Sequence, residues 1–266
     1  MMRRALAGVL RGAFLLAFAA LILGPLLVLA LWSLAQQWFW PQLWPASFTL
    51  RWYEWAGTVP NVLHALRMSV IVAVAATVAT TVIALPAAFV LGRYQFPGRA
   101  VVRGLFSIPL LVPYIGLGVG VASMFYALKL NGTLVAVVLA HMIAALPFGV
   151  MIIGAGLEEL PRETEEAGLV CGADPWTVFR RVTLPQLVPA LLAQAAYVFM
   201  LSMDEVTLTL LVSSPETATL PVQMYSAMGE GYLQISSALA MLLLLPSVAV
   251  SYLIARFMRA DVTAAS

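Results

Sequence analysis

The sequence predicts an all-α integral membrane protein with about six transmembrane helices. Hydrophobic residues make up 62% of the 266-residue chain and charged residues only 10%, whereas soluble domains carry about 25% charged residues. The charged residues also leave six long gaps along the chain. Each gap offers the roughly 20 apolar residues that a helix needs to cross the hydrocarbon core of a bilayer. No linker or low-complexity tract interrupts the pattern, so we interpret residues 1–266 as one transmembrane domain.

The gaps predict where the spans lie. They are expected at residues 14–34, 67–91, 104–128, 133–156, 187–211 and 235–257. The first apolar stretch exceeds the roughly 7 to 15 residues of a cleaved signal peptide, so we interpret it as a permanent span. Prolines and glycines recur within the spans, as at Leu85-Pro86 and Gly116-Leu117-Gly118. This pattern fits either close helix packing or a gating hinge.

Lysine and arginine are distributed unevenly between the two sides of the expected spans. Only Arg51, Arg67 and Lys129 lie on one side. The other side holds Arg3, Arg4, Arg11, Arg93, Arg99, Arg103, Arg162, Arg180, Arg181, Arg256 and Arg259. Because basic residues concentrate in cytoplasmic loops, this asymmetry predicts that both termini and the loop at 157–186 are cytoplasmic. The expected location is the bacterial inner membrane, with multiple passes.

A cluster of tryptophans follows the first expected span, on its outer side. Its members are Trp38, Trp40, Trp44, Trp52 and Trp55. Tryptophan favours the headgroup layer of a bilayer, so an interfacial belt is one interpretation. A surface touched by a periplasmic partner is the other.

The cytoplasmic loop has an internal order that a merely solvated loop would lack. Half of the chain's 12 acidic residues lie between Glu158 and Asp174. Residues 162–170 favour a helix with acidic residues near its start, and Gly172 supplies a stop. Asp174 followed by Pro175 is typical of a second helix start, where the carboxylate caps free amides. Leu184-Pro185 is expected to end this second helix and to lead into the fifth span.

At this loop the sequence resembles a known family, the type I permease subunits of binding-protein-dependent ABC importers. Their cytoplasmic signature is Glu-Ala-Ala, three residues, Gly, nine residues, Ile, any residue, Leu-Pro. Here Glu166-Ala167-Gly168 is followed at the same spacing by Gly172 and by Val182-Thr183-Leu184-Pro185. Gly168 and Val182 depart from the signature. Gly168 weakens the helix by up to about 1 kcal/mol relative to alanine.

The resemblance implies that this loop docks into a groove on a cytoplasmic ATPase. The implied coupling residues are Glu165, Glu166, Ala167, Gly168, Gly172, Asp174, Leu184 and Pro185. The implied partners are two ABC ATPase subunits, a second homologous or identical permease, and a periplasmic solute-binding protein. We expect Glu166 to pair with basic residues of the ATPase, so that closure of the ATP sites is transmitted to the spans.

Several chemistries are excluded or disfavoured by the residues present. A phosphate-binding loop needs a Gly-Lys pair, and the single lysine, Lys129, follows Leu128. ATP and magnesium are therefore expected on the partner ATPase, and no cofactor or nucleic acid is expected on this chain. The single cysteine, Cys171, excludes an internal disulfide. His64 and His141 lack metal-ligand spacing, so no metal site is expected.

Acidic residues near the outer end of the fifth span are candidates for the solute pathway. Ser202, Asp204 and Glu205 lie there, and carboxylates at membrane depth are usually functional or paired. They could line a route for a cation, or anchor the helix by bonding to a neighbour. Residues 202–207 and 219–226 resemble the spermidine and putrescine branch of the family. Branches for aminoethylphosphonate, iron, thiamine or sulfate share much of this pattern.

Two rival functions fit less well. A secondary transporter or channel would work alone and should show intramembrane charges or inverted repeats, neither of which is evident. An intramembrane enzyme would need a nucleophile and a base at a recognisable spacing, and His141 stands alone in an apolar stretch. We therefore expect no covalent chemistry in this chain.

Overall fold

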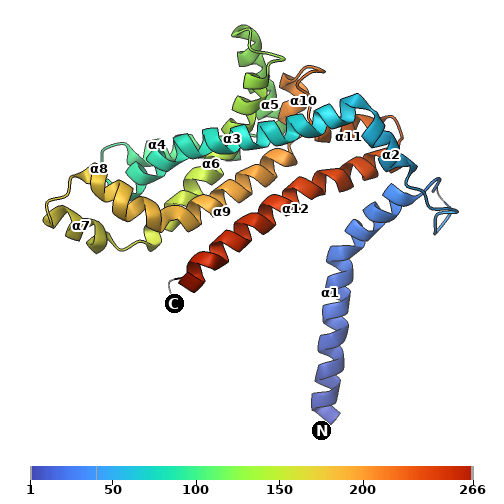
Figure 1. Ribbon diagram of the computed structural model, residues 1–266, viewed down its shortest axis with the longest axis horizontal. Coiled ribbons are helices and arrows are strands. Elements are labelled where there is room, and N and C mark those ends of the chain that lie inside the picture. Colours follow the sequence, from blue (N-terminus) through green and yellow to red (C-terminus); the bar gives the residue numbers. More distant parts are fainter. Residues whose placement is uncertain (1, 40, 265–266) are drawn as a thin grey trace. The chain divides into compact units, whose positions relative to one another are not determined.

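A computed structural model describes residues 2–39 and 41–264 of the chain (Figure 1). Trp40, one of the expected aromatic-belt residues, lies outside the described residues. Across the described ranges the regular structure is helical, and the β-type pairing is an isolated bridge between Ala35 and Phe48. The prediction of an all-α protein is confirmed. The chain divides into two compact units, which are described separately below.

The first unit comprises residues 1–63 and 223–242. It contains α1 (Met2–Leu34), α2 (Arg51–Thr58) and parts of α11 (Leu220–Gly229) and α12 (Leu233–Ala264). Trp52 Nε1 donates a hydrogen bond to the Ala35 carbonyl at 2.8 Å, and the Tyr53 hydroxyl donates to Ser33 Oγ at 2.7 Å. These two bonds hold the start of α2 against the end of α1, so the intervening polar and aromatic segment forms a closed loop.

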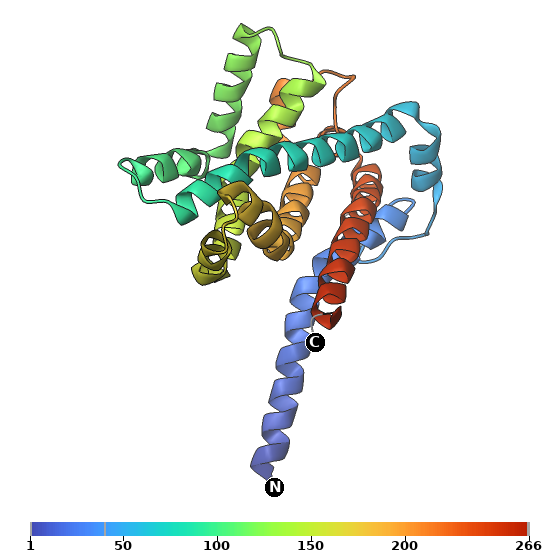
Figure 2. The ribbon, with the colours of Figure 1, turned by 60° about the vertical axis from the view of Figure 1, so that its left-hand side comes forward.

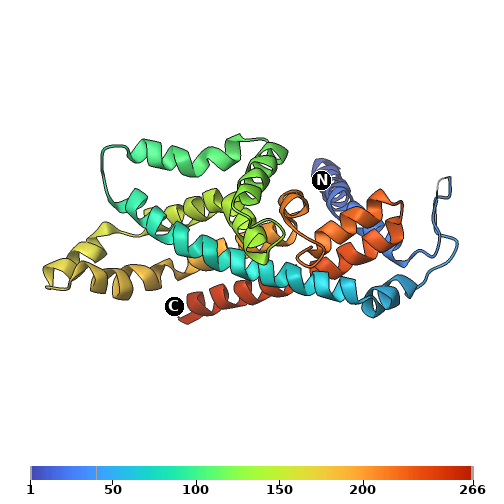
Figure 3. The ribbon, with the colours of Figure 1, turned by 90° about the horizontal axis from the view of Figure 1, so that it is seen from above.

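The second unit comprises residues 64–222 and 243–266 and carries the loop singled out above. It contains most of α3 (Pro60–Arg93), then α4 (Arg99–Leu111), α5 (Tyr114–Ala127), α6 (Leu134–Glu159), α7 (Arg162–Val170), α8 (Pro175–Val178), a π-helical turn (Phe179–Thr183), α9 (Leu184–Met203) and α10 (Thr207–Val212), and the remaining parts of α11 and α12. Its core forms where α6 packs along α9 and against α3 (Figure 3). Ile153, Leu157 and Leu187 are fully buried there. The helix ends that carry the loop are thereby held together.

Several helices are long and apolar enough to cross a membrane. By length and composition, the described part of the chain has five such segments, or six if the bent pair α4 and α5 counts as one span. The five are Arg11–Leu34, Asn61–Arg93, Leu134–Glu159, Pro175–Met203 and Leu233–Ile254. This agrees with the expectation of about six spans. The side of the membrane on which each end lies stays a prediction.

The structure refines the expected span at 104–128 in one respect. The segment is broken at Val112 and Pro113 into α4 and α5, and the chain bends by 106° between them. Figure 2 shows this bend. The clash of a proline ring with the preceding residue disfavours helical angles there, and Val112 is indeed extended, with φ −87° and ψ 132°. The span is therefore bent, and the turn presents Tyr114 at the start of α5.

The fifth expected helix, at 187–211, also differs from the structure. Helix α9 ends at Met203, and α10 begins at Thr207, so Asp204 and Glu205 lie in a break between helices. The expectation that Leu184-Pro185 ends the preceding helix is wrong as well. Helical structure runs from Pro175 through to Met203. A π-helical turn over Phe179–Thr183 directly precedes Leu184-Pro185.

Candidate functional site

The loop at 157–186 forms two short helices at the end of the unit where α3 and α6 terminate (Figures 1 and 3). The first, α7, spans Arg162–Val170, as the sequence predicts. Gly172 has φ +87°, a left-handed conformation that glycine adopts without strain and that ends a helix. The chain then reverses into α8. The predicted helix, glycine stop and second helix are confirmed.

Asp174 caps the start of α8. Its Oδ1 accepts hydrogen bonds from the amides of Trp176 at 3.0 Å and Thr177 at 3.1 Å. The Thr177 hydroxyl donates to Oδ2. These bonds, with the Thr177 hydroxyl contributing most, hold the pKa of Asp174 below its usual value, because they stabilise the charged form. Pro175 occupies the first helical turn, as predicted.

Gly168, which departs from the family signature, lies against α8. A Cβ atom added at Gly168 would lie 3.1 Å from Val178 Cγ2, tighter than ordinary contact. Val178 is buried. The missing side chain therefore lets α8 pack closely on α7, and this packing offsets the low helix propensity of glycine.

A partly buried ion pair joins the loop to the membrane helices. Arg93, at the end of α3, lies 3.0 Å from Glu165 on α7. The side chains are 9% and 17% exposed. The Thr183 hydroxyl, which directly precedes α9, donates to the same carboxylate oxygen at 3.1 Å. Glu165 therefore connects α3, α7 and the start of α9 at a single point, which we call the Glu165 junction.

Further bonds reinforce the Glu165 junction. Arg93 Nη2 also donates to the Leu160 carbonyl at 3.2 Å. Arg162 Nη2 donates to the Gly92 carbonyl at 3.1 Å. From the sequence, Arg93 is predicted only as one of the basic residues on the cytoplasmic side of the spans, not as a site residue. A basic residue at the end of one apolar gap, facing an acidic loop, was the available signal.

The outward side of the loop exposes a mixed apolar and acidic surface. Glu166 and Ala167 are exposed, whereas neighbouring Glu165 is partly buried. Val170 is 86% exposed and Trp176 is 66% exposed. Val170 ends α7 and Trp176 lies on α8, and exposed apolar side chains beside acidic ones are typical of a protein interaction surface. Leu184 and Pro185 begin α9, where Leu184 is half-buried and Pro185 exposed.

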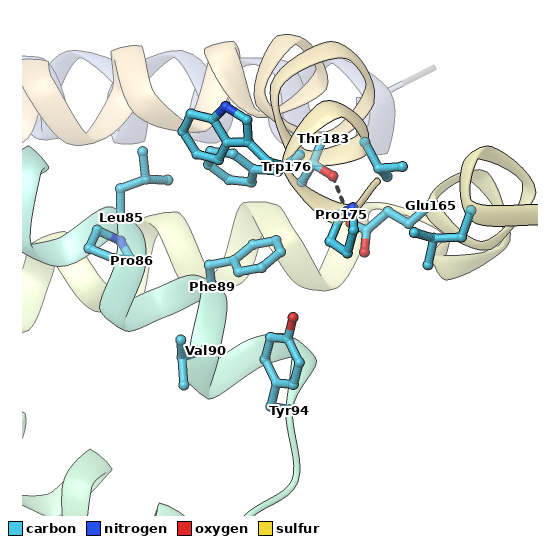
Figure 4. A pocket seen from close by; sticks show the side chains of 12 residues that line it. Leu85, Pro86, Phe89, Val90, Tyr94, Glu165, Pro175, Trp176 and Thr183 are labelled. Atoms are coloured by element: carbon cyan, nitrogen blue, oxygen red, sulfur yellow. Dashed lines mark hydrogen bonds between the residues drawn. The ribbon is translucent and has the colours of Figure 1, made fainter. Parts of the chain in front are cut away.

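A hollow of about 460 Å³ lies between the loop and the end of α3 (Figure 4). One wall is formed by Leu85 and Phe89 of α3 and by Tyr94, which directly follows α3. The opposite wall carries Trp176 and Phe179. The Phe89 and Phe179 rings pack edge to face with centroids 5.1 Å apart, a favourable aromatic geometry. The hollow is almost entirely apolar, and Glu165 and Thr183 lie at its side.

The residues expected to line the solute pathway lie in different environments. Glu205 is 6% exposed. It accepts hydrogen bonds from the Tyr114 hydroxyl and the Leu208 amide, both at 2.6 Å. Glu205 thus connects the bend before α5 to the start of α10. Asp204 is exposed at the end of α9, and Ser202 is buried. The structure therefore brings Ser202 and Glu205 into one polar cluster and leaves Asp204 outside it.

His141 on α6 completes this cluster. Its Nδ1 lies 2.6 Å from Ser202 Oγ, and its Nε2 lies 2.7 Å from Thr209 Oγ1. All three side chains are buried. A serine and a histidine at this distance resemble a catalytic pair, but the outer partner is a hydroxyl rather than the carboxylate that orients a catalytic base. The arrangement accounts for His141 as a packing residue that links α6, α9 and α10.

Apolar helices able to cross a membrane, combined with a helical loop that carries the Glu-Ala-Gly and Leu-Pro elements, define a multi-pass membrane protein of the transport permease class. Residues 84–263 match the family described as binding-protein-dependent transport system inner membrane component. The chain belongs to this family, and the predicted resemblance is confirmed.

Two curated relatives match nearly the whole chain. The spermidine/putrescine transport system permease protein PotC of Escherichia coli is 30% identical over 253 residues, covering 93% of this chain and 94% of the relative. PhnV of Salmonella typhimurium, assigned to 2-aminoethylphosphonate transport, is also 30% identical, covering 90% of this chain and 89% of the relative. The two relatives differ in the solute that their names state.

Solved structures share the fold. A chain of a bacterial ABC transporter involved in the import of the acidic polysaccharide alginate superposes with a TM-score of 0.75 at 15% identity, covering 97% of this chain and 98% of that chain. A chain of the MetNI methionine ABC transporter superposes with a TM-score of 0.61 at 22% identity, covering 76% of this chain and 99% of that chain. The fold is therefore that of type I ABC importer permeases.

Proposed function

We propose that this chain is the permease subunit of an ATP-driven importer, which moves a small solute from periplasm to cytoplasm by alternating access. It pairs with a second, homologous or identical permease, two cytoplasmic ABC ATPase subunits and a periplasmic solute-binding protein. Both termini face the cytoplasm of a bacterium, and the spans lie in its inner membrane. ATP and magnesium bind the ATPase subunits, so this chain itself is not an enzyme.

The Glu165 junction is the observation that carries the proposal. Transmission of a distant event needs an element whose state both sites bias. Glu165 bonds to Arg93 and Thr183, so a displacement of α7 pulls on the ends of α3 and α9 together. Through this connection, a movement of the docked loop is transmitted to the membrane helices.

The exposed surface of α7 and α8 supplies the contact with the ATPase. Glu166 is exposed and free to pair with basic residues of an ATPase, and Val170 and Trp176 offer apolar anchors. Well-packed apolar and aromatic anchors dominate the binding energy of interfaces. We therefore assign the contact with the ATPase to this surface. The Glu165 junction connects the same loop to α3 and α9.

For the solute, we propose a polyamine such as spermidine or putrescine. The similarity to PotC supports this choice, and exposed Asp204 offers a carboxylate for an ammonium group. Aminoethylphosphonate is a second candidate, because PhnV is similar to the same degree. Glu205 is engaged by Tyr114, so we assign direct contact with solute to Asp204 and a positioning role to Glu205 and Ser202.

Uptake into proteoliposomes tests the proposal. The permease is reconstituted with its ATPase subunits and supplied with its binding protein and radiolabelled spermidine or aminoethylphosphonate. We expect uptake of spermidine that requires both ATP and the binding protein. Uptake without ATP would identify a secondary transporter or channel instead. ATP-dependent uptake of aminoethylphosphonate alone would support the importer and reject the polyamine assignment.

A further inference from the structure

A second hollow, of about 260 Å³, lies between the ends of α3 and α6 and the first turns of α4. It shares no lining residue with the hollow beside the Glu165 junction. Its α6 wall includes Pro147, Val150, Gly154 and Glu158, which are spaced by three or four residues. Residues at this spacing lie on one face of a helix, so the wall is a continuous stripe. We call this hollow the inner cleft.

The inner cleft carries both signs of charge at one end. Arg103 and Glu158 line it, and both residues are exposed. They lie just outside the expected spans at 104–128 and 133–156, on the side that is cytoplasmic in the orientation proposed above. A span covers the hydrocarbon core, so residues that directly flank a span lie at the level of the lipid headgroups. The charged end of the cleft is therefore placed in the headgroup layer of the cytoplasmic leaflet.

The rest of the inner cleft is mainly apolar and lies within the expected spans. Phe106 of α4 and Val150 of α6 line this part. Along α6 the lining extends from Glu158 to Pro147, a length of about 16 Å at the rise of an α-helix. This is about half the thickness of the hydrocarbon core. The cleft thus has a charged end and an apolar groove that is as long as one leaflet is deep.

The two charges of the inner cleft form no ion pair with each other or with another side chain among the described residues. Glu158 also borders a neighbouring hollow that is lined by Arg93 and Arg162. Arg93 is paired there with Glu165, and Arg162 donates to the Gly92 carbonyl. The cleft therefore offers one guanidinium and one carboxylate to a ligand that carries both charges.

We propose that the inner cleft binds a zwitterionic phospholipid whose headgroup carries a primary ammonium group, as in phosphatidylethanolamine. Arg103 holds the phosphate, Glu158 accepts hydrogen bonds from the ammonium group, and one acyl chain lies along Phe106 and Val150. A purely anionic headgroup would place negative charge beside Glu158, so charge complementarity selects the zwitterion. The bound lipid contacts α4 and α6 together and stabilises their packing.

A free solute could offer the same headgroup chemistry. In 2-aminoethylphosphonate, two carbons join an ammonium group to a phosphorus acid, but there is no acyl chain. Such a solute would leave the apolar groove uncovered, whereas an acyl chain removes it from water. The apolar lining therefore favours the lipid, and competition between the two ligands distinguishes them.

The test is lipid retention by the full chain in mild detergent, measured by native mass spectrometry. The probes are dioleoyl phosphatidylethanolamine, phosphatidylcholine and phosphatidylglycerol. We expect the wild type to retain phosphatidylethanolamine preferentially. Arg103→Gln should weaken this retention by about fivefold, which corresponds to about 1 kcal/mol. Glu158→Gln should abolish the preference for phosphatidylethanolamine over phosphatidylglycerol, because the carboxylate that disfavours a purely anionic headgroup is gone.

Matched controls change exposed residues outside the inner cleft. Arg180→Gln and Glu159→Gln remove the same charges from positions that do not line it, and should keep the wild-type preference. Equal retention of phosphatidylethanolamine by the wild type, Arg103→Gln and Glu158→Gln would overturn the proposal. Displacement of the lipid by free 2-aminoethylphosphonate would overturn it in favour of a solute site.

A further variant tests the apolar groove. Gly154 lines the cleft, and a Cβ atom added there meets no neighbouring atom within 4 Å. Gly154→Leu should therefore fold, helped by the higher helix propensity of leucine, yet it should reduce retention although both charges remain. Gly104→Leu is the control, since Gly104 has the same open surroundings on α4 but does not line the cleft. Equal retention by these two variants would contradict an acyl chain in the groove.

The same measurement on the assembled transporter tests whether a protein covers the inner cleft instead. We expect the lipid to remain bound when the partner subunits are present. Its loss on assembly would overturn the proposal and identify a partner subunit as the occupant. None of these measurements requires ATP or transport, so a negative result would leave the proposed importer function intact.

Discussion

Glu165 and Glu166 show how far the roles of adjacent identical residues can diverge. Glu165 is held at the Glu165 junction by Arg93 and Thr183, whereas Glu166 points outward. A period of 3.6 residues per turn places consecutive residues about 100° apart on a helix, so the two carboxylates cannot share one environment. The inner carboxylate holds the loop to the spans, and the outer one is available to a partner.

Substitutions of Glu165 and of Glu166 should therefore have different effects. Glu165→Gln removes the charge that balances Arg93 in a partly buried site, and should lower the free energy of unfolding by roughly 1–3 kcal/mol. It should also uncouple ATP hydrolysis from uptake. Glu166→Gln, the matched surface control, should change stability by less than about 0.5 kcal/mol and weaken only assembly with the ATPase. Thermal unfolding and a pull-down measure the two effects. Equal loss of stability in both variants would contradict the junction.

Substitutions of the two acidic residues expected in the pathway, Asp204 and Glu205, should also have different effects. Glu205→Leu and Tyr114→Phe each remove one partner of the same 2.6 Å bond. Each should destabilise the protein by about 1–2 kcal/mol, since a buried polar group loses its partner. Asp204→Asn should leave stability unchanged and raise the KM for spermidine several-fold. If Asp204→Asn instead leaves the KM for spermidine unaltered, Asp204 does not contact the solute.

At the residue scale, the types and positions of the site residues were more predictable from the sequence than the residues that they contact. Acidic residues at 165, 204 and 205 stood out because charge is rare in this chain. Nothing local indicated that Arg93, 72 positions away from Glu165, would meet it. The same applies to Tyr114 and Glu205, which are 91 positions apart. Such pairings depend on how helices pack, which a single sequence without an alignment does not encode in any local pattern.

At the scale of elements, local chemistry determined what was predictable. Helix α7, its glycine stop and the Asp174 cap follow from propensity and capping, which act over a few residues. The breaks proved harder to predict. Val112-Pro113 turns the chain by 106°, yet Pro86 and Pro147 lie within helices that continue. Leu184-Pro185 did not end its helix, and a π-helical turn directly precedes it. Whether a proline bends or breaks a helix is decided by its packing.

The turn between α7 and α8 can be tested by its backbone angle. Gly172 has φ +87°, which proline, fixed near −65°, cannot adopt. Gly172→Pro should leave the spans inserted in the membrane but misplace α8, so that ATP hydrolysis no longer drives uptake. Gly172→Asn is the control, because asparagine tolerates the left-handed region and should retain most activity. Normal coupling in the proline variant would show that the turn is not needed.

The Asp174 cap should respond to pH in a defined direction. Its lowered pKa means that the cap is fully formed above the usual carboxyl pKa and is lost as pH falls through the lowered value. Asp174→Ala should speed hydrogen exchange at the amides of Trp176 and Thr177, while Asp174→Asn, which can still cap, should not. The ratio of exchange rates between the alanine variant and the wild type should approach one at acidic pH. A ratio independent of pH would contradict the cap.

At the scale of the whole molecule, the charge distribution carried most of the information. Six uncharged gaps predicted the number of spans because a charge in hydrocarbon is costly. Membership of the transport family accounts for the same pattern. The solute is less determined, because a pathway is lined by few residues and relatives named for different solutes match this chain equally. The shared fold thus identifies the transporter family, whereas a small number of side chains determines which solute is transported.

The central claim is that the turn between α7 and α8 lies in the cytoplasm and is covered by an ATPase. Cys171 is the single cysteine of the chain and is exposed in this turn, so its labelling by a membrane-impermeant maleimide needs no engineered residue. We predict labelling in inside-out vesicles but not in intact spheroplasts, and protection once the ATPase subunits are added. Labelling from the outside, or labelling at an unchanged rate with the ATPase bound, would contradict the account.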